Sequence, residues 1–190
     1  MTDEENERKA ALIELITTAF QNVVRGGGVS LHEADVIDRT GYDNKNAKNR
    51  VAARRLDTDR RWQDVPDKDI EDCYNILSFL DTEGLRYYAP AYMVWALKHF
   101  KTSGSMSSDS IIYTFNPYLN TGHYEWEMER FAVFSAEQKT AICGFLRFMS
   151  EDSDEFADEY QASQALTGYW DQFCDAEGWQ GTIRTGGQIV

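Results

Sequence analysis

The chain has few basic residues, few cysteines and no long apolar run, and each shortage narrows what the protein can be. Its 190 residues contain 19 Lys and Arg against 32 Asp and Glu, a formal net charge of -13. Such a chain repels nucleic-acid phosphates at long range, so nucleic acid is disfavoured as a partner. No apolar run reaches the length of a membrane span, and the acidic first residues have the wrong charge for a signal peptide. We therefore expect a cytoplasmic protein that does not enter a membrane.

The three cysteines, Cys73, Cys143 and Cys174, are far apart and form no C-x-x-C pair. This spacing argues against a zinc knuckle and against a thioredoxin-type motif. Each cysteine lies among the apolar residues of a helical pattern. We expect three buried, reduced thiols, which are typical of a reducing compartment.

The chain does have enough apolar material for one ordinary domain. It is 42% hydrophobic and 13% aromatic, and a domain of this length buries about 70% of its unfolded surface. Apolar residues recur at helical spacing from Leu12 to Val23 and in several later stretches. Capping boxes at Ser30–Glu33 and Ser135–Gln138 begin two further helices. The pattern predicts a mainly α (α+β) single-domain bundle of about six to seven helices.

One segment follows a different period. Tyr124, Trp126 and Met128 alternate with glutamates, which predicts a strand with one buried face. Residues 111–115 would be its partner, and Asn, Pro and Gly between the two runs supply turn residues. We therefore expect one small β-hairpin near 111–134. It would belong to a helical core of residues 1–149, followed by an acidic helix at 150–178 on or beyond that core and a flexible tail at 179–190.

The segment after Phe148 is strongly acidic. It contains no Lys or Arg before Arg184, while nine Asp and Glu residues occur in it. One interpretation is that these charges only keep the protein soluble. The other is that they dock a basic protein partner, as in immunity proteins and enzyme inhibitors, where opposite charge speeds association. Tyrosine and tryptophan are frequent interface anchors. The predicted partner-binding residues are Asp154, Glu155, Asp158, Glu159, Tyr160 and Trp170.

Basic residues gather in one place, between Lys45 and Arg61. No aromatic residue is interleaved before Trp62, so a solvated helix face is favoured over a nucleic-acid site. This stretch could meet the acidic segment of the same chain or of another, and the composition does not fix the oligomeric state.

Nothing in the sequence assembles a catalytic centre. There is no G-x-S-x-G elbow, and His32, His99 and His123 are scattered. The acids between Asp64 and Asp72 are explained by a helix start, whose dipole favours negative charge. We predict no catalytic residue, no metal and no cofactor, and favour a non-enzymatic protein.

A second interpretation rests on the helix that begins after Asp81. Pro90 interrupts its apolar pattern, and proline inside a helix removes a hydrogen bond and predicts a kink or break near residues 87–89. Asp81, Arg86 and Tyr88, with Asp38 or His32, would then line a pocket for a small ligand or substrate. The structural alternative is that Asp81 caps the helix, Arg86 pairs with an acid such as Glu83, and the tyrosines pack.

The stretch around these residues, Leu77-Ser-Phe-Leu-Asp-Thr-Glu-Gly-Leu-Arg-Tyr-Tyr-Ala-Pro-Ala-Tyr-Met93, resembles a family of unknown function found mainly in bacterial proteins, whose core reads "LSFLDPEGFRFYLPAYM". Residues 30–38 and 62–66 are similar to the family's upstream elements, and Arg130, Phe131 and Gln138 to its later part. Thr82 stands where the family often has Pro. The resemblance spans residues 12–149, which places the acidic segment outside it. It implies no activity; a site shared by the family would use Asp38, Asp81, Arg86 and Tyr88.

Overall fold

The computed structural model describes residues 3–117, 124–153 and 156–174. Its elements are α1 (Asp3–Ala19), α2 (Leu31–Thr40), η1 (Asn44–Asn46), α3 (Ala47–Arg54), η2 (Trp62–Asp64), α4 (Asp67–Asp72), η3 (Leu77–Phe79), α5 (Thr82–His99), α6 (Ser107–Phe115), α7 (Tyr124–Phe131), α8 (Ala136–Glu151), α9 (Glu159–Gly168) and η4 (Trp170–Phe173), where η marks a 3-10 turn. A helical bundle is therefore confirmed. None of the helices in the described ranges is long and apolar enough to cross a membrane.

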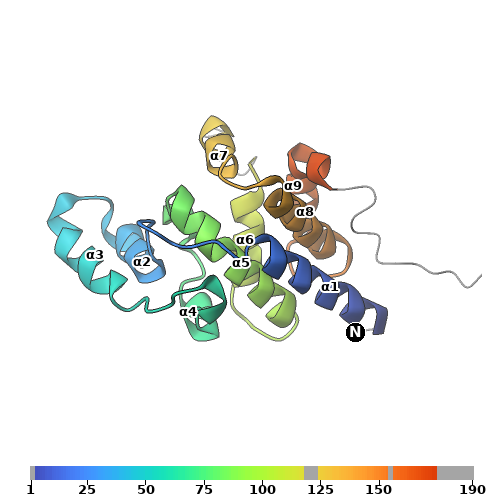
Figure 1. Ribbon diagram of the computed structural model, residues 1–190, viewed down its shortest axis with the longest axis horizontal. Coiled ribbons are helices and arrows are strands. Elements are labelled where there is room, and N and C mark those ends of the chain that lie inside the picture. Colours follow the sequence, from blue (N-terminus) through green and yellow to red (C-terminus); the bar gives the residue numbers. More distant parts are fainter. Residues whose placement is uncertain (1–2, 118–123, 154–155, 175–190) are drawn as a thin grey trace, which may run out of the picture.

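Helix α5 is the centre of the bundle (Figure 1). It contacts α1, α4, α6 and η2, and residues on all its sides are buried, among them Leu85, Tyr88, Tyr92 and Trp95. A helix that is apolar on every side must lie inside the protein. Asp81 caps its start, because the Oδ1 atom accepts a hydrogen bond from the Gly84 amide at 2.8 Å. The helix runs through Pro90 without the predicted break.

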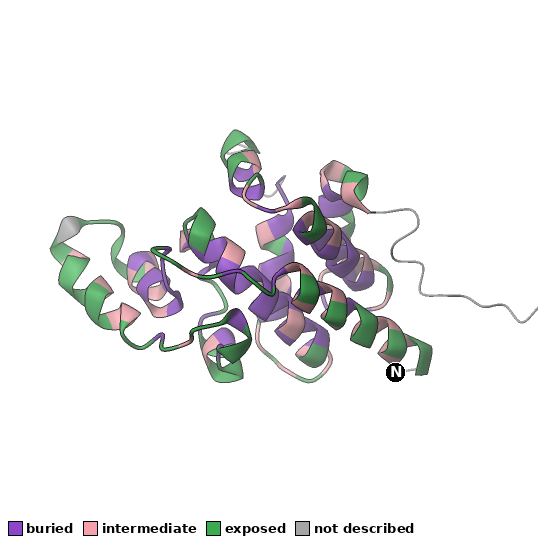
Figure 2. Ribbon diagram, viewed as in Figure 1, coloured by how far each residue is buried: buried purple, intermediate pink, exposed green. Residues whose placement is uncertain are grey.

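The remaining helices surround α5 unevenly. Helices α1, α8 and α9 pack together beside it, while α2 and α3 form a lobe at the opposite end of the molecule (Figure 1). Helix α3 buries no residue, and its outer face is exposed along its length (Figure 2). The surface position predicted for this segment is thereby confirmed.

The predicted β-hairpin is wrong. Residues 111–115 belong to helix α6, residues 124–131 form helix α7, and the described part of the chain contains no strand. The alternation of aromatic residues and glutamates indicated a strand with all glutamates on its exposed face, but one of these glutamates faces inward. Glu127 and Arg130 form a buried ion pair at 3.0 Å one helical turn apart. The outward-facing Trp126 then covers the Arg130 guanidinium, 4.5 Å from its ring centre.

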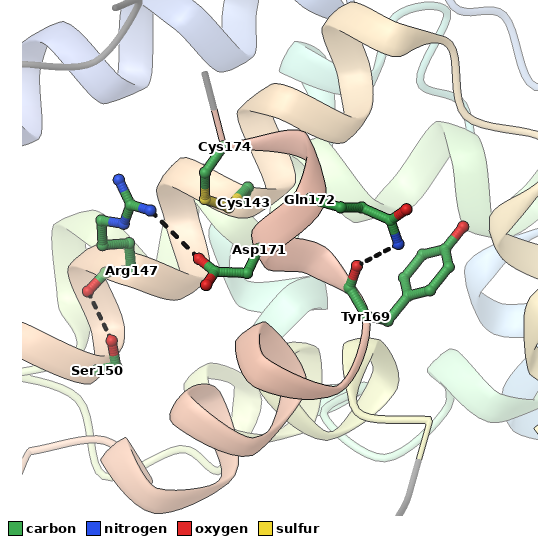
Figure 3. The surroundings of a disulfide bond; sticks show 7 residues. All are labelled: Cys143, Arg147, Ser150, Tyr169, Asp171, Gln172 and Cys174. Atoms are coloured by element: carbon green, nitrogen blue, oxygen red, sulfur yellow. Dashed lines mark hydrogen bonds and ion pairs between the residues drawn. A yellow bond between two sulfur atoms is a disulfide. The ribbon is translucent and has the colours of Figure 1, made fainter. Parts of the chain in front are cut away.

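The prediction of three reduced thiols is also wrong, because Cys143 and Cys174 form a disulfide (Figure 3). Their Cα atoms are 5.5 Å apart, within the range that a disulfide requires. The pairing arises because the chain turns back after α8, so that α9 and η4 pack on that helix. Arg147 of α8 and Asp171 of η4 pair at 3.3 Å beside the bond (Figure 3). Cys73 alone is a free, buried thiol.

The described residues after position 150, which end at Cys174, contribute to the core, whereas the tail predicted at 179–190 lies outside the described residues. Trp170 is fully buried, and its indole nitrogen donates a hydrogen bond to the Phe115 carbonyl at 2.7 Å. Its ring lies 5.3 Å from that of Phe115 and 4.9 Å from that of Phe131. The single acidic helix predicted for 150–178 is divided between the end of α8, α9 and η4.

Reduction of the disulfide should destabilise the fold. The bond closes a loop between positions 31 residues apart, and loop-closure entropy gives roughly 3–4 kcal/mol for that length. We expect dithiothreitol to lower the Tm of the wild-type chain by roughly 10 °C. The Tm of Cys174→Ser should already be lowered and should not respond to the reductant, whereas Cys73→Ala should respond as the wild type does. Equal Tm values for oxidised and reduced wild-type protein would contradict this assignment.

Candidate functional site

A polar network lies against the first half of α5 and joins three distant segments. The Tyr88 hydroxyl accepts a hydrogen bond from Arg25 Nη1 at 2.6 Å. The Tyr87 hydroxyl donates to Asp59 Oδ2 at 2.7 Å. The same Asp59 oxygen lies 3.5 Å from Arg25 Nη1, and the Asp59 side chain is only 4% exposed. Arg25 follows α1 and Asp59 follows α3, so α5 brings both connections together.

The surroundings keep both tyrosines protonated. Burial raises the pKa of Tyr87 and of Tyr88, and Asp59 raises both further. Burial opposes the charge of Arg25, but Tyr88, Asp59 and Asp57 together raise its pKa. A phenol with a raised pKa cannot act as a base at neutral pH. The network therefore holds α5 against the connections that follow α1 and α3.

Asp57 extends the network to α2. Its carboxylate accepts a hydrogen bond from the His32 backbone at 3.2 Å and lies 2.7 Å from His32 Nδ1. The Asp57 side chain is 2% exposed. Both His32 and Asp57 are thus committed to holding the start of α2, and His32 does not meet Arg86.

A hollow of about 290 Å³ opens beside this network, and Asp59, Asp64 and Asp69 line it. Asp64 is paired with Arg61 at 2.6 Å. The three carboxylates are not close enough to share an ion: in the described ranges, the group with three metal-ligand atoms within 4.8 Å of one another is Cys143, Asp171 and Cys174. Two of those atoms are the bonded sulfurs of the disulfide. The oxidised protein therefore has no set of ligands for a metal at that place.

The four residues that the resemblance singled out have separate partners. Asp81 caps α5 and also accepts a hydrogen bond from the Val29 amide at 3.0 Å. Asp38 accepts from Asn75 at 2.9 Å. Tyr88 meets Arg25, and Arg86 donates from Nε to Gln138 Oε1 at 3.2 Å. The four side chains therefore neither hydrogen-bond to one another nor share a partner among these contacts.

Sequence reasoning missed Arg25, Asp57 and Asp59. Arg25 precedes a run of three glycines, and Asp57 and Asp59 lie at the end of the basic stretch, so neither place has a local pattern that indicates a partner. Their roles depend on contacts across 25 to 63 positions of sequence, and no local spacing indicates such pairs.

The basic stretch from Lys45 to Arg61 is largely used within its own lobe. Arg50 and Arg54 each lie 2.9 Å from the Glu33 carboxylate. Burial opposes the charge on Glu33, but its hydrogen bonds with the two arginines lower its pKa. These ion pairs attach α3 to α2. Two of the seven basic residues of the stretch therefore pair in cis with Glu33.

An acidic–aromatic patch lies where α6 meets the start of α9. We define it by Tyr113, Phe156, Tyr160, Asp109, Asp158 and Glu159. The Tyr113 hydroxyl donates to Asp158 Oδ2 at 2.9 Å, and the Asp158 amide donates to Asp109 Oδ1 at 2.9 Å. Phe156 is 57% exposed and Tyr160 65% exposed. Of the other predicted partner-binding residues, Trp170 lies in the core, and Asp154 and Glu155 lie outside the described residues.

The charged side chains of the patch are all acidic, and the Asp158 carboxylate accepts hydrogen bonds from the Tyr113 hydroxyl and, at 3.1 Å, from the Gln161 amide. Burial and the nearby Asp158 raise the pKa of Asp109, although the Asp158 amide opposes that shift. Burial and Asp158 raise the pKa of Tyr113 to about 12. No Lys or Arg occurs between Phe148 and Ile183. A positive group placed here would relieve the repulsion between two neighbouring carboxylates.

The comparisons with known proteins give a family and no activity. The model of a family of unknown function, DUF6714, matches residues 8–174, so the chain belongs to that family. The match includes α9 and η4, which corrects the narrower range of 12–149 and makes the C-terminal segment part of the family's domain. No curated protein and no solved structure matches the chain.

The buried tyrosines predict an alkaline loss of stability. Their pKa values are raised in the folded state above the ordinary value of 10.0, so the unfolded chain releases these protons first. The contribution of these two tyrosines to the free energy of unfolding should therefore be constant below about pH 9 and fall as the pH rises past 10. Denaturant unfolding between pH 8 and 11 measures this. The double variant Tyr87→Phe/Tyr88→Phe should be less stable at pH 8, by roughly 2 kcal/mol, with a shallower alkaline slope. An unchanged slope would contradict the raised pKa values.

Asp109→Asn tests the repulsion in the patch. The folded-state pKa of Asp109 lies above the ordinary value of 3.8, so ionised Asp109 lowers stability at neutral pH and this cost disappears as the pH falls below that value. Asparagine keeps the acceptor for the Asp158 amide and removes the charge. We expect its Tm to exceed that of the wild type by roughly 1–3 °C at pH 7, with the difference vanishing near pH 3. A lower Tm at pH 7 would show that the charge is compensated.

Proposed function

We propose that the chain is a non-enzymatic protein-binding domain that docks a basic protein partner through the acidic–aromatic patch. The observation that carries this proposal is the exposure of Phe156 and Tyr160, at 57% and 65%, in a segment whose charged neighbours are all acidic. Large aromatic side chains lose apolar contact with water when a partner covers them. Their exposure beside Asp158 is the arrangement that interface anchors with a charged rim have.

The state of the other polar groups supports binding rather than catalysis. The hydroxyls of Tyr87 and Tyr88 and the carboxylates of Asp57 and Asp59 are engaged with one another or with Arg25 and His32. No described nucleophile is paired with a base that a third group orients, which is the geometry that nucleophilic catalysis needs.

The negative charge of the chain indicates that its partner is a basic protein. The chain carries -13 overall, so an approaching basic protein is attracted from a distance before any contact forms. Asp109 and Asp158 then offer two adjacent carboxylates to a lysine or arginine of the partner, and Phe156 and Tyr160 offer apolar area. Such a role resembles that of small acidic inhibitors and immunity proteins.

Point variants test the proposal better than truncation. Deletion after Ser150 would remove Trp170 and the disulfide from the core, so a loss of binding would only report unfolding. Phe156→Ser/Tyr160→Ser changes two exposed side chains instead. Val51→Ser/Leu56→Ser is the matched control, since it removes two large apolar side chains that are 56% and 63% exposed at the opposite end of the molecule.

The measurement is affinity capture by the full-length chain from the native lysate, at low and at moderate salt, followed by mass spectrometry. We expect a stoichiometric basic protein to be retained by the wild type and the control and lost, by at least ten-fold, with Phe156→Ser/Tyr160→Ser. Salt should release it, because exposed charges are screened. A partner retained equally by the patch variant, or one that is not basic, would contradict the proposal.

A further inference from the structure

A second hollow, of about 480 Å³, lies between the end of α1, the first half of α5 and the start of α8. Its volume is in the range of sites for small organic molecules, roughly 300–1,000 Å³. It shares no lining residue with the polar network or with the acidic–aromatic patch. Any role of this hollow is therefore separate from the docking proposed above.

Arg86 is positioned in the wall of this hollow by a buried glutamine. Gln138 is 3% exposed, and its Oε1 atom accepts from Arg86 Nε at 3.2 Å and from the Ser135 amide at 3.1 Å. Its Nε2 atom donates to the Ala19 carbonyl at 3.2 Å. Every polar atom of the Gln138 side chain is thus engaged, and the side chain fixes the plane of the guanidinium.

The two terminal nitrogens of Arg86 have no partner among the described residues, because the guanidinium bonds only through Nε. The acid that also lines the hollow, Glu137, is exposed, and its carboxylate accepts a hydrogen bond at 2.7 Å from Ser135 Oγ of the same lining. That bond lowers the pKa of Glu137, so the carboxylate stays ionised. Arg86 therefore presents an unused bidentate donor to a hollow that also contains one fixed negative charge.

The rest of the lining defines what else the ligand must have. Leu15, Ala19 and Val23 provide apolar surface from α1 and the residues that follow it, and the polar side chains of Thr18, Gln21 and Asn22 line the hollow between them. A single arginine next to one carboxylate favours a monoanion over a doubly charged phosphate, because the second negative charge would face Glu137 without a cation. Arginine pairs with a carboxylate through two parallel hydrogen bonds.

We propose that this hollow binds a small organic monocarboxylate. The carboxylate accepts two hydrogen bonds from the terminal nitrogens of Arg86, and the apolar body of the ligand lies on Leu15, Ala19 and Val23. The glutamine is a positioning residue, since it holds Arg86 and does not touch the ligand.

The probes are 3-phenylpropionate, its uncharged analogue 3-phenylpropanamide and inorganic phosphate. Titration calorimetry on the full-length chain measures their affinities, and the NMR signal of the Arg86 Nε–H reports contact at the site. The variants are Arg86→Gln, which removes the charge, and Arg86→Lys, which keeps the charge without the planar fork. Arg60→Gln is the control, since Arg60 is an exposed arginine that lines the other hollow.

We expect saturable binding of 3-phenylpropionate to the wild type and to Arg60→Gln, with a shift of the Arg86 Nε–H signal in the wild type. Arg86→Gln should weaken binding at least ten-fold, Arg86→Lys by a smaller factor, and 3-phenylpropanamide should bind at least ten-fold more weakly than the acid. Circular dichroism and Tm establish that each variant is folded. The proposal is overturned by an absence of saturable binding at millimolar 3-phenylpropionate, by equal affinity for the amide, by tighter binding of phosphate, or by undiminished binding to folded Arg86→Gln.

Discussion

The fold depends on the way in which one buried helix satisfies its own hydroxyl groups. Three tyrosines of α5 lie in the interior, and each hydroxyl bonds to a different connecting segment. Tyr88 accepts from Arg25 after α1, Tyr87 donates to Asp59 after α3, and Tyr92 donates to the Cys73 carbonyl after α4 at 2.6 Å. A buried hydroxyl without a partner lowers stability by roughly 1–3 kcal/mol, so these segments must lie where the tyrosines reach them. These three hydrogen bonds therefore hold the connections after α1, α3 and α4 against α5.

The same hydrogen bonds also determine which polar side chains of the molecule are occupied in holding the fold. The polar groups nearest α5 are the ones that a catalytic site would need, and they are consumed in holding the fold. Some side chains at the surface, by contrast, have apolar area or hydrogen-bond donors that no contact described above uses. Phe156 and Tyr160 expose apolar area beside paired carboxylates, and Arg86 presents two nitrogens to a hollow. Under the two proposals made above, binding takes place at these outer surfaces, while the buried network around α5 stabilises the fold.

The features that could be predicted from the sequence are those set by residues close together in the chain. Helices with a regular apolar stripe were found, and both capping boxes begin helices where they were placed, at Ser30 and Ser135. The β-hairpin prediction was wrong because it assumed that every charged residue in the alternating segment faces solvent. Glu127 is instead buried in an ion pair with Arg130, so the alternation of polar and apolar residues does not mark a strand. The disulfide and the Arg25–Tyr88 contact could not be predicted for another reason. Both join residues that are far apart in the sequence and become neighbours only where the chain reverses its direction, and the spacing of residues does not indicate where that happens. Among the candidate site residues, the role of Asp81 as a helix cap could be predicted from the sequence. The contact that Arg86 makes could not, because it depends on where α8 packs.

The central claim is that the acidic–aromatic patch is the surface that meets the partner. Its most direct measurement is photocrosslinking of the full-length chain in cells, with benzoylphenylalanine introduced in place of Tyr160 or, as the reference position, in place of Tyr74, which is 43% exposed in the turn after α4. The account predicts a discrete adduct with a basic protein from position 160 and none from position 74. Adducts from both positions alike, or from position 74 only, would contradict it.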